Sequence, residues 1–241
     1  MMKRVVIVGA TSGIGSEIAK IYLKEGWLIG AAGRREELLS SLRAIAPEKI
    51  VVEKIDINDD NSPTYLHKLI DKLGGMDLFV LTSGIGSRNY CLEPHMELET
   101  ADTNVKGFMR MTTAAFNYFC ANGGGHIAVI SSIAGTKGLG IAPAYSATKR
   151  FQSTYIDALS QLARLKKVHI RFTDIRPGFV ATALLKEGTY PMLMKPDRVA
   201  RKVVRAVNRR KRIVVIDYRY RILVFFWRLI PRPLWERLPI Q

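Results

Sequence analysis

The chain has 241 residues, 48% hydrophobic and 24% charged, an ordinary globular composition that excludes a disordered or collagen-like chain. Its two cysteines form no disulfide framework, and neither they nor the four histidines have the spacing of a metal site. The formal net charge of +16 is unevenly spread, because residues 195–241 carry 14 Lys or Arg against 3 Asp or Glu. Such a basic end points to a polyanion or an anionic membrane surface.

Neither end of the sequence predicts a targeting or membrane-spanning segment. The N-terminal apolar run is short and lacks a cleavage region. The longest apolar run near the C-terminus, residues 222–227, is far below the ~20 residues that cross a bilayer. We therefore expect a cytoplasmic protein, with a peripheral place on the inner face of a membrane as its nearest alternative.

Short β-branched runs alternate with longer helical patterns, with no repeat and no linker between halves. The strands are almost entirely apolar, which indicates burial on both faces and hence a parallel sheet between two layers of helices. We predict an α/β fold, a Rossmann-like doubly wound parallel seven-stranded sheet in one domain over residues 1–217. The predicted strands are 4–8, 27–32, 50–55, 77–81, 126–131, 168–175 and 213–216.

A glycine-rich turn follows the first strand, and a helical pattern from Ser16 to Lys24 follows the turn. Glycines let a backbone approach a pyrophosphate closely, and the free N–H groups at a helix N-terminus favour its negative charge. The turn therefore predicts a phosphate-binding site made by Gly9, Thr11, Ser12, Gly13, Ile14 and Gly15.

The GxxxGxG spacing of this turn resembles the short-chain dehydrogenase/reductase family, whose signature is TGxxxGxG. Val8 stands where the family often has Thr. The resemblance extends over about residues 4–216. It implies a dinucleotide-binding and catalytic domain that transfers a hydride between a nicotinamide ring and a carbonyl or alcohol carbon.

The end of the second strand bears on the choice of cofactor. An enzyme selective for NAD places Asp or Glu here to hold the ribose 2′-hydroxyl, whereas arginine suits a 2′-phosphate. Gly33 occupies the acid position and Arg34 follows it, so the sequence favours NADP (NADPH) over NAD; a solvated arginine pair is the alternative. Asp56 matches the family residue beside the adenine ring, with a loop or cap role as its alternative.

Two further matches lie in the middle of the chain. Ser83 and Gly84 follow the fourth strand where the family has Ala-Gly, but Thr82 replaces the family Asn, which puts that residue's strand-stabilising hydrogen bonds in question. Asn104, within the helical stretch 97–121, matches a member of the family's catalytic tetrad. Its family role is to hold a water that links the catalytic lysine to solvent, and asparagine otherwise has poor helix propensity.

The remaining tetrad matches are Ser132, Tyr145 and Lys149. Ser132 ends the fifth strand 13 residues before Tyr145, the family's usual separation, with a turn or cap as its alternative. Tyr145 and Lys149 share one face of the helical stretch 144–166 because they are four residues apart. An ammonium nearby is expected to lower the phenol pKa from about 10. The resemblance implies that Tyr145 donates the proton in reduction, Ser132 polarises the carbonyl, and Lys149 and Asn104 support the relay.

The same helical stretch carries an apolar stripe, which we expect to pack against the sheet or a partner subunit of a homo-oligomer. The stripe consists of Ala147, Phe151, Tyr155, Ala158, Leu159 and Leu162.

The residues after the sixth strand predict the substrate side. Pro177, Gly178 and Thr182 match the family element that contacts the nicotinamide amide.

Specificity for the substrate in this architecture lies in loops beyond the strand ends, here 85–93, 136–142 and 179–196. The last loop suits an apolar small-molecule substrate, with packing on its own domain as the alternative. Its apolar residues are Phe179, Val180, Leu184, Leu185, Tyr190, Met192, Leu193 and Met194.

Residues 218–241 form a basic, apolar C-terminal extension, which we do not regard as a separate domain. It predicts an amphipathic helix over 218–230, broken by Pro231. No nucleic-acid motif is present. The segment either covers the cleft or a subunit partner, or lies in a membrane interface with Phe225, Phe226, Trp227 and Leu229 inserted. We favour the membrane and expect removal of 218–241 to spare the cofactor site.

Taken together, the motifs predict an NADP-dependent oxidoreductase that interconverts a ketone and a secondary alcohol. A long-chain 3-keto lipid is the favoured kind of substrate, and a 3-oxoacyl thioester or a steroid is the alternative. A non-catalytic dinucleotide-binding sensor or scaffold at a membrane surface is the alternative from another class. The complete Asn-Ser-Tyr-Lys set argues against it.

Overall fold

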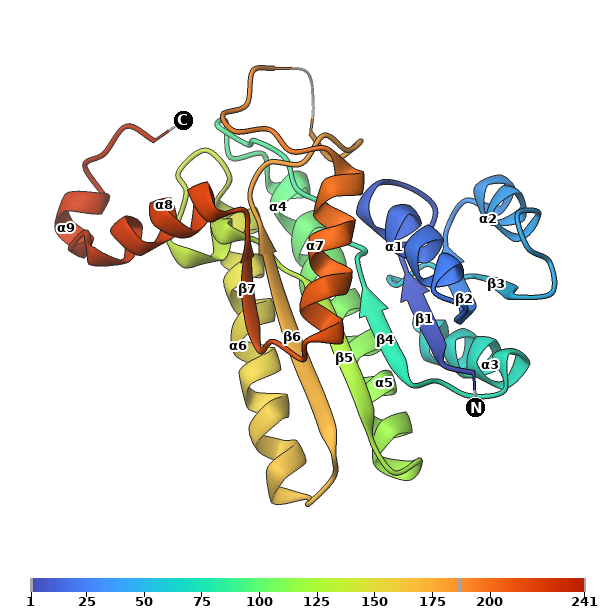
Figure 1. The fold of residues 1–241 in the computed structure, drawn as a ribbon. Coiled ribbons are helices and arrows are strands. Elements are labelled where there is room, and N and C mark those ends of the chain that lie inside the picture. Colours follow the sequence, from blue (N-terminus) through green and yellow to red (C-terminus); the bar gives the residue numbers. More distant parts are fainter. Residues whose placement is uncertain (1, 186–187, 241) are drawn as a thin grey trace.

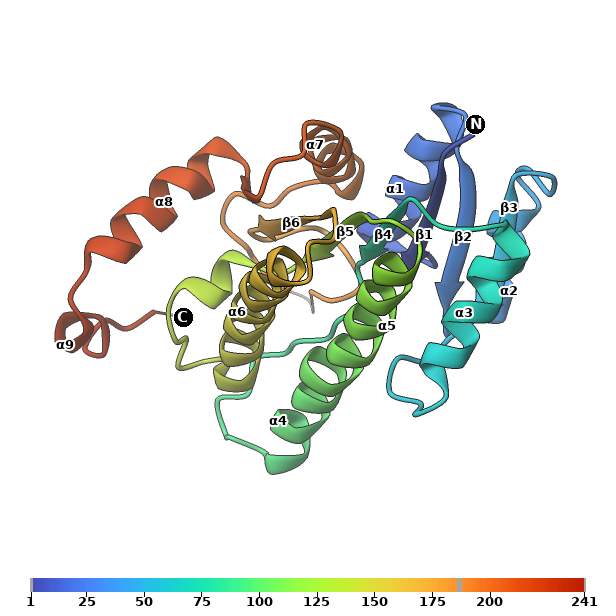
Figure 2. The same ribbon diagram turned by 90° about the horizontal axis from the view of Figure 1, so that it is seen from below.

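The computed structural model describes residues 2–185 and 188–240. Over these residues a seven-stranded parallel sheet, in the order β3-β2-β1-β4-β5-β6-β7, lies between two layers of helices (Figures 1 and 2). The order reverses between β1 and β4, and a doubly wound sheet opens a crevice there, outside the carboxyl ends of its strands. The strands are β1 (Arg4–Val8), β2 (Leu28–Gly33), β3 (Ile50–Lys54), β4 (Leu78–Leu81), β5 (Gly125–Ile130), β6 (Ile170–Pro177) and β7 (Ile213–Ile216).

Helices cover both faces of the sheet. Figure 2 shows α1 and α7 on one side and α3, α5 and α6 on the other. The helical elements are α1 (Gly13–Lys24), α2 (Glu36–Arg43), α3 (Ser62–Leu73), α4 (Pro94–Ala101), the π-helical η1 (Asp102–Gly107), α5 (Phe108–Ala121), the 3₁₀ turn η2 (Ile133–Thr136), α6 (Pro143–Leu165), α7 (Pro196–Asn208), α8 (Tyr218–Leu229) and α9 (Arg232–Trp235).

The apolar strands fill a core on each face, as their composition predicts. Side chains alternate along a strand, so Val5 and Ile7 of β1 enter the core under α1 and α7. Val6 and Val8 enter the core under α3 and α5. The predicted fold class and all seven strands are confirmed, with boundaries that differ by at most two residues.

Two helical predictions differ from the structure. The stretch predicted over 97–121 begins at Pro94 and is divided by η1, a wider turn that contains Asn104. Half of the apolar stripe predicted on α6 packs on the core, because Leu159 is buried and Phe151 and Tyr155 pack beside it. Ala147, Ala158 and Leu162 are exposed. The buried face begins with polar residues instead: Ser146, Thr148, Lys149, Gln152 and Ser153, followed by Ile156, Leu159 and Ala163.

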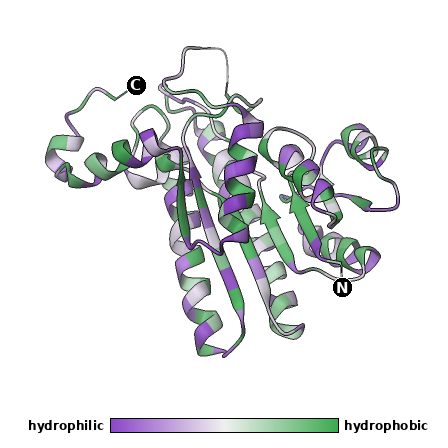
Figure 3. Cartoon of the chain, in the orientation of Figure 1, coloured by the Kyte–Doolittle hydropathy of each residue, from purple (hydrophilic) through white to green (hydrophobic). Residues whose placement is uncertain are grey.

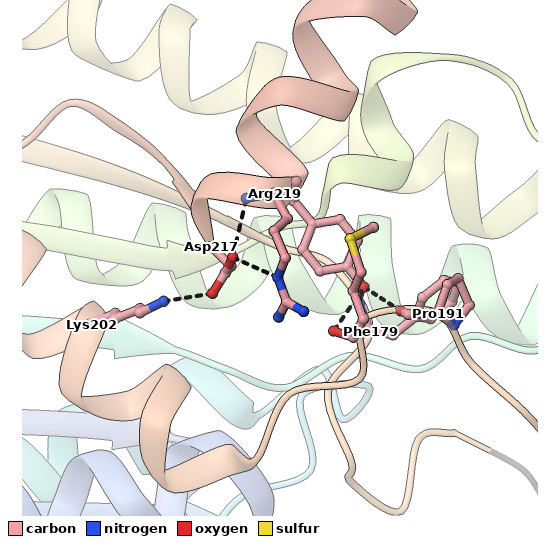
Figure 4. A network of polar contacts seen from close by, with 7 residues as sticks. Phe179, Pro191, Lys202, Asp217 and Arg219 are labelled. Atoms are coloured by element: carbon pink, nitrogen blue, oxygen red, sulfur yellow. Dashed lines mark hydrogen bonds and ion pairs between the residues drawn. The ribbon is translucent and has the colours of Figure 1, made fainter.

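The C-terminal extension starts at a strained elbow after β7. Asp217 has φ +103°, rare for a residue with a side chain. Its carboxylate accepts from the Arg219 N–H at 3.1 Å, capping α8, and pairs with Lys202 Nζ at 2.9 Å (Figure 4). These contacts hold the Asp217 pKa well below its usual range. They stabilise a backbone conformation that is otherwise unfavourable.

The extension is partly core. Tyr220 and Val224 are fully buried and join the cluster under α1 and α7. The expectation that 218–241 can be removed without effect on the site is therefore not supported by the packing. Figure 3 shows apolar segments along α8 and α9. In the part of the chain that the structure describes, no helix is long and apolar enough to cross a bilayer.

The basic charge is divided between the two edges of the sheet. Residues 209–212, Arg-Arg-Lys-Arg, connect α7 to the start of β7 at the amino edge, far from α8 at the carboxyl edge (Figure 1). The four basic residues 209–212 therefore lie away from α8 and do not add to the charge around it.

Candidate functional site

A cleft of about 1140 Å³ opens at the carboxyl ends of the strands. It spans the switch point between β1 and β4 and extends to the C-terminal extension. Of the site residues predicted from sequence, those that line this cleft are Gly9, Thr11, Ser12, Gly13, Ile14, Gly15, Arg34, Asp56, Ser83, Gly84, Ser132, Tyr145, Lys149, Pro177, Gly178 and Thr182. Asn104 is fully buried behind the cleft.

The glycine-rich turn forms a backbone cradle at the N-terminus of α1. Gly9 has φ +96°, a conformation that favours glycine. A Cβ on Gly15 would lie 2.2 Å from the Gly9 carbonyl oxygen, so no larger residue fits. Thr82 Oγ1 donates to the main-chain oxygens of Val8 and Gly9 at 3.1 and 3.0 Å. The threonine thus supplies hydrogen bonds to the end of β1 despite replacing the family asparagine.

Both arginines after β2 lie at the mouth of this cradle. Arg35 Nη2 donates to Thr11 Oγ1 at 2.9 Å and to Ser12 Oγ at 2.6 Å. Arg34 Nη1 lies 3.9 Å from the Asp56 carboxylate. The sequence analysis selected Arg34 and missed Arg35. The signal was the arginine pair itself, but its spacing does not reveal which side chain turns toward the glycines.

Tyr145 and Lys149 lie on the first turns of α6, with Ser132 opposite them at the end of β5. The Tyr145 ring lies directly against Gly86, where a Cβ would be 2.2 Å from Cδ2. Lys149 Nζ is 5.7 Å from the centre of that ring. Ser132 Oγ accepts from the Ala134 N–H at 3.1 Å and donates a long, 3.4 Å bond to the Pro177 carbonyl. That weak bond leaves the hydroxyl available to a better acceptor.

Burial shifts these two groups in opposite directions. It raises the Tyr145 pKa above 10, with a Ser132 hydrogen bond acting the other way. The lowered phenol pKa that was expected beside Lys149 is not found, because desolvation of the phenolate dominates. Burial lowers the Lys149 pKa to about 8, and the Asp174 carboxylate opposes that shift.

Asn104 holds a loop of the cleft wall in place. Its Oδ1 accepts from the Ile85 N–H at 2.9 Å, and its Nδ2 donates to the Ile85 carbonyl at 2.7 Å. Nδ2 also donates to Thr148 Oγ1 at 3.1 Å, so both amide hydrogens have partners. Its main-chain carbonyl accepts from Gln152 Nε2 at 2.9 Å. The side chain thus fixes the loop after β4 to α6.

The Pro-Gly element is fastened to the C-terminal extension. A Cβ on Gly178 would lie 2.2 Å from the Tyr220 ring, so glycine is needed for this close approach. Tyr220 Oη accepts from the Phe179 N–H at 3.1 Å and donates to the Pro191 carbonyl at 2.8 Å. Figure 4 shows Phe179 and Pro191 beside each other, near the elbow at Asp217. One phenol therefore connects the start of the 179–196 loop and its later part, at Pro191, to α8.

The part of the cleft beside the 179–196 loop is lined mainly by apolar side chains. Not all of the apolar loop residues predicted to bind the substrate line the cleft, because Leu193 is exposed and Met194 belongs to the core. Those that line the cleft are Phe179, Val180, Leu184, Leu185, Tyr190 and Met192. Leu223 and Ile240, which carry no sequence signal for a site, also line the cleft, as does Trp227, which was expected in a membrane. Covering of the cleft, the alternative for this segment, is thus present in the structure.

Comparisons with known proteins agree with this geometry. The sequence profile described as short chain dehydrogenase matches residues 3–190. An uncharacterized oxidoreductase of Mycobacterium tuberculosis (strain ATCC 25618 / H37Rv) is 29% identical over 86% of this chain and 85% of its own. The dehydrogenase/reductase SDR family member 7B of Xenopus tropicalis is also 29% identical, over 94% of this chain and 81% of its own.

Solved structures show the same fold. The 3-ketoacyl-(acyl-carrier-protein) reductase of Brucella melitensis, complexed with NADH, has a TM-score of 0.79 at 24% identity, covering 89% of this chain and 96% of its own. An alcohol dehydrogenase from Thermococcus sibiricus, complexed with 5-hydroxy-NADP, has a TM-score of 0.76 at 23% identity, covering 90% and 96%.

Proposed function

The chain belongs to the short chain dehydrogenase family, and from this premise we propose that it is an NADP(H)-dependent reductase of apolar ketones, acting at an anionic membrane surface. The observation that carries the reaction is a single cleft that contains the glycine cradle, Ser132, Tyr145 and Lys149. Sixteen predicted positions separated along the chain meet in that cleft, which packing alone does not require.

The residues of the cradle fit a dinucleotide. Gly9 and Gly15 leave room where any Cβ would collide with backbone or with Thr82. The N-terminus of α1 presents unpaired N–H groups to a pyrophosphate. Two guanidinium groups, those of Arg34 and Arg35, lie beside the cradle and suit a 2′-phosphate. Position 33 is glycine and not the acid that would hold a 2′-hydroxyl. When bound, the nicotinamide supplies or accepts the hydride.

Side chains of the cleft then stabilise the substrate oxygen and donate a proton to it. Ser132 exchanges its weak bond to Pro177 for one to the substrate oxygen, which stabilises negative charge as it develops there. Tyr145 remains protonated at neutral pH because its pKa is raised, so it donates the proton during reduction. Lys149 holds a positive charge beside the phenol and favours proton release from it.

The cofactor choice is tested with separate arginine variants. Arg34→Ala and Arg35→Ala should each lower kcat/KM with NADPH more than with NADH, because only NADPH has a 2′-phosphate whose contact is lost. Arg34→Asp should shift the preference toward NADH. Arg43→Ala, an exposed arginine at the end of α2, is the matched control. An unchanged ratio of the two cofactors in all three variants contradicts the NADP proposal.

The substrate class follows from the apolar half of the cleft. A series of methyl ketones of increasing chain length, together with a 3-oxoacyl thioester and a steroid ketone, measures the preference. We expect kcat/KM with NADPH to rise with chain length because each buried methylene adds about 0.8 kcal/mol. A preference for short polar ketones would contradict an apolar substrate.

The membrane proposal rests on the outer face of α8. Its inner face packs on the body through Tyr220 and Val224, while a second stripe at helical spacing remains in water. That stripe is Ile222, Phe225, Phe226 and Leu229, which are 54%, 60%, 58% and 63% exposed. Exposed Arg221 and Arg228 flank it. Large apolar groups beside arginines match a bilayer interface with anionic headgroups.

Vesicle co-sedimentation tests this surface. We expect the protein to bind phosphatidylcholine vesicles only when phosphatidylglycerol is added, and Phe225→Ser/Phe226→Ser to abolish binding while NADPH binding persists. Leu165→Ser is the matched control, since Leu165 is 75% exposed on α6. If the double variant instead dissociates a dimer seen by light scattering, a second copy covers the stripe and the membrane proposal fails.

A further inference from the structure

Gln152 lies between the Lys149 ammonium and the π-helical turn that carries Asn104. It follows Lys149 by three residues on α6, which places both on one helix face, and it is only 1% exposed. Its Oε1 accepts from Lys149 Nζ at 3.1 Å, and its Nε2 donates to the main-chain carbonyl of Asn104 at 2.9 Å. The sequence analysis gave this residue no role.

The partners fix the orientation of the Gln152 amide. An ammonium has only donors and a main-chain carbonyl has only acceptors, so the amide oxygen must face the first and the amide nitrogen the second. A leucine in this place would satisfy neither group. An ionised glutamate would accept from Lys149 but could not donate to Asn104. Glutamine is therefore the residue that completes both bonds.

The other groups around Lys149 do not duplicate this bridge. Lys149 Nζ also donates to the Ile130 carbonyl at 3.2 Å. Tyr145 faces it from the same helix. From β6, Asp174 is buried and favours the charged lysine, but its carboxylate already accepts from Arg176 Nε at 2.8 Å and from Arg176 Nη2. Gln152 alone, among the described residues bonded to Lys149, connects it to the Asn104 turn.

We propose that Gln152 is a positioning residue, which holds the Lys149 ammonium beside Tyr145 by bridging it to the main chain of Asn104. The family resemblance implies a water held by Asn104 next to the lysine; here a side-chain amide makes that connection. An amide does not take up and release protons as water does, so Gln152 fixes the ammonium and favours its charged form. The inference deepens the proposed function and rests on it for the kinetic readout alone.

The direct test is the titration of Lys149 in the cofactor-free protein. Lysines labelled with ¹³C at Cε are followed by NMR, and the Lys149 signal is identified by its loss in Lys149→Arg. In the unsubstituted protein burial lowers the Lys149 pKa to about 8. We expect Gln152→Leu to lower the midpoint by about one pH unit, and Gln152→Glu to raise it by about one unit or more.

Gln161 supplies a matched control, because it is an exposed glutamine on the same helix. Gln161→Leu and Gln161→Glu should leave the Lys149 midpoint unchanged. Thermal melting checks that each variant is folded, and Gln152→Met replaces Gln152→Leu if the latter is not. Folded Gln152 variants with the unsubstituted midpoint would overturn the proposal.

Kinetics give the second readout. With NADPH and the best ketone of the series, the alkaline limb of kcat should move down in Gln152→Leu and up in Gln152→Glu. A residue that only packs the helix would lower kcat equally at every pH and leave the limb in place, which would also overturn the proposal. If no ketone is reduced, the proposed function fails while the NMR titration still decides the role of Gln152.

Discussion

At the scale of single residues, burial shifts the pKa values of Tyr145 and Lys149 in opposite directions. The Tyr145 phenol is held neutral because its pKa is raised, while the pKa of Lys149 falls to about 8. Near neutral pH the phenol therefore has a proton to donate and the lysine is still mostly charged. Both effects arise because burial desolvates the charged forms of these two groups, and neither requires an unusual residue.

Replacement of Tyr145 tests the assigned donor. Tyr145→Phe keeps the ring against Gly86 and removes only the hydroxyl. We expect kcat to fall by about 10²- to 10⁴-fold, the usual contribution of a general acid. NADPH binding, followed by its fluorescence, should be retained. Tyr155→Phe on the same helix is the control. Equal kcat values in the two variants would refute Tyr145 as the proton donor.

The lysine pKa predicts a pH dependence with a defined sign. A lysine whose pKa is lowered to about 8 loses its charge above that pH. Proton donation by Tyr145 then lacks its cationic partner, so kcat in the reducing direction should decline as the pH rises through about 8. Steady-state rates from neutral to alkaline pH measure this decline. A kcat that stays constant well above about pH 8 contradicts a role for the Lys149 charge.

Residue chemistry decided which parts of the site could be predicted. The glycine cradle, Ser132, Tyr145 and Lys149 need particular residue types at fixed spacings, and the sequence records both. Arg35 and Gln152 act through the direction in which a common side chain points. That direction depends on packing from distant elements, which no local pattern reveals.

At the scale of elements, α8 forms one wall of the cleft and supports the 179–196 loop. Tyr220 bonds this loop at Phe179 and at Pro191 through a single hydroxyl. The sequence predicted the helix from its apolar content. It did not predict that one face packs in the core while the other is exposed. Similarly, the predicted stripe on α6 is confirmed only at Phe151, Tyr155 and Leu159, because the start of that helix buries polar groups, and the hydrophobic pattern cannot describe such a face.

Tyr220→Phe should loosen the loop while keeping the ring on Gly178. The Phe179 N–H and the Pro191 carbonyl each lose a partner, so we expect the free energy of unfolding to fall by about 1–3 kcal/mol. KM for an apolar ketone should rise, with NADPH affinity unchanged. Urea unfolding and steady-state kinetics measure both. Tyr218→Phe, exposed on the same helix, is the control, and equal effects in the two variants would refute the proposed anchor.

At the scale of the whole molecule, the C-terminal extension shares a hydrophobic core with the sheet. Deletion of residues 218–241 removes Tyr220 and Val224 from the core. Loss of a large buried side chain costs about 2–5 kcal/mol, and a typical domain has only about 5–15 kcal/mol of stability. We expect the truncated chain to be largely unfolded by circular dichroism. A truncated chain that unfolds at the same urea concentration as the full chain would contradict this packing.

The α/β architecture was predictable because seven apolar strands and their connecting helices admit few other arrangements. The place of the basic charge was not, since residues 209–212 and α8 are close in sequence but lie at opposite edges of the sheet. Only the path of β7 between them separates the two.

Reduction of a ketone by NADPH in this cleft can be followed by the transfer of deuterium. NADPH carrying deuterium at C4 of the nicotinamide is incubated with the apolar ketone series, and the alcohol is analysed by mass spectrometry. The account predicts deuterium on the carbinol carbon with the unsubstituted protein, and almost none with Tyr145→Phe. NADPH that binds in the cleft while no ketone in the series acquires deuterium would contradict it, and would indicate a dinucleotide-binding protein without catalytic activity.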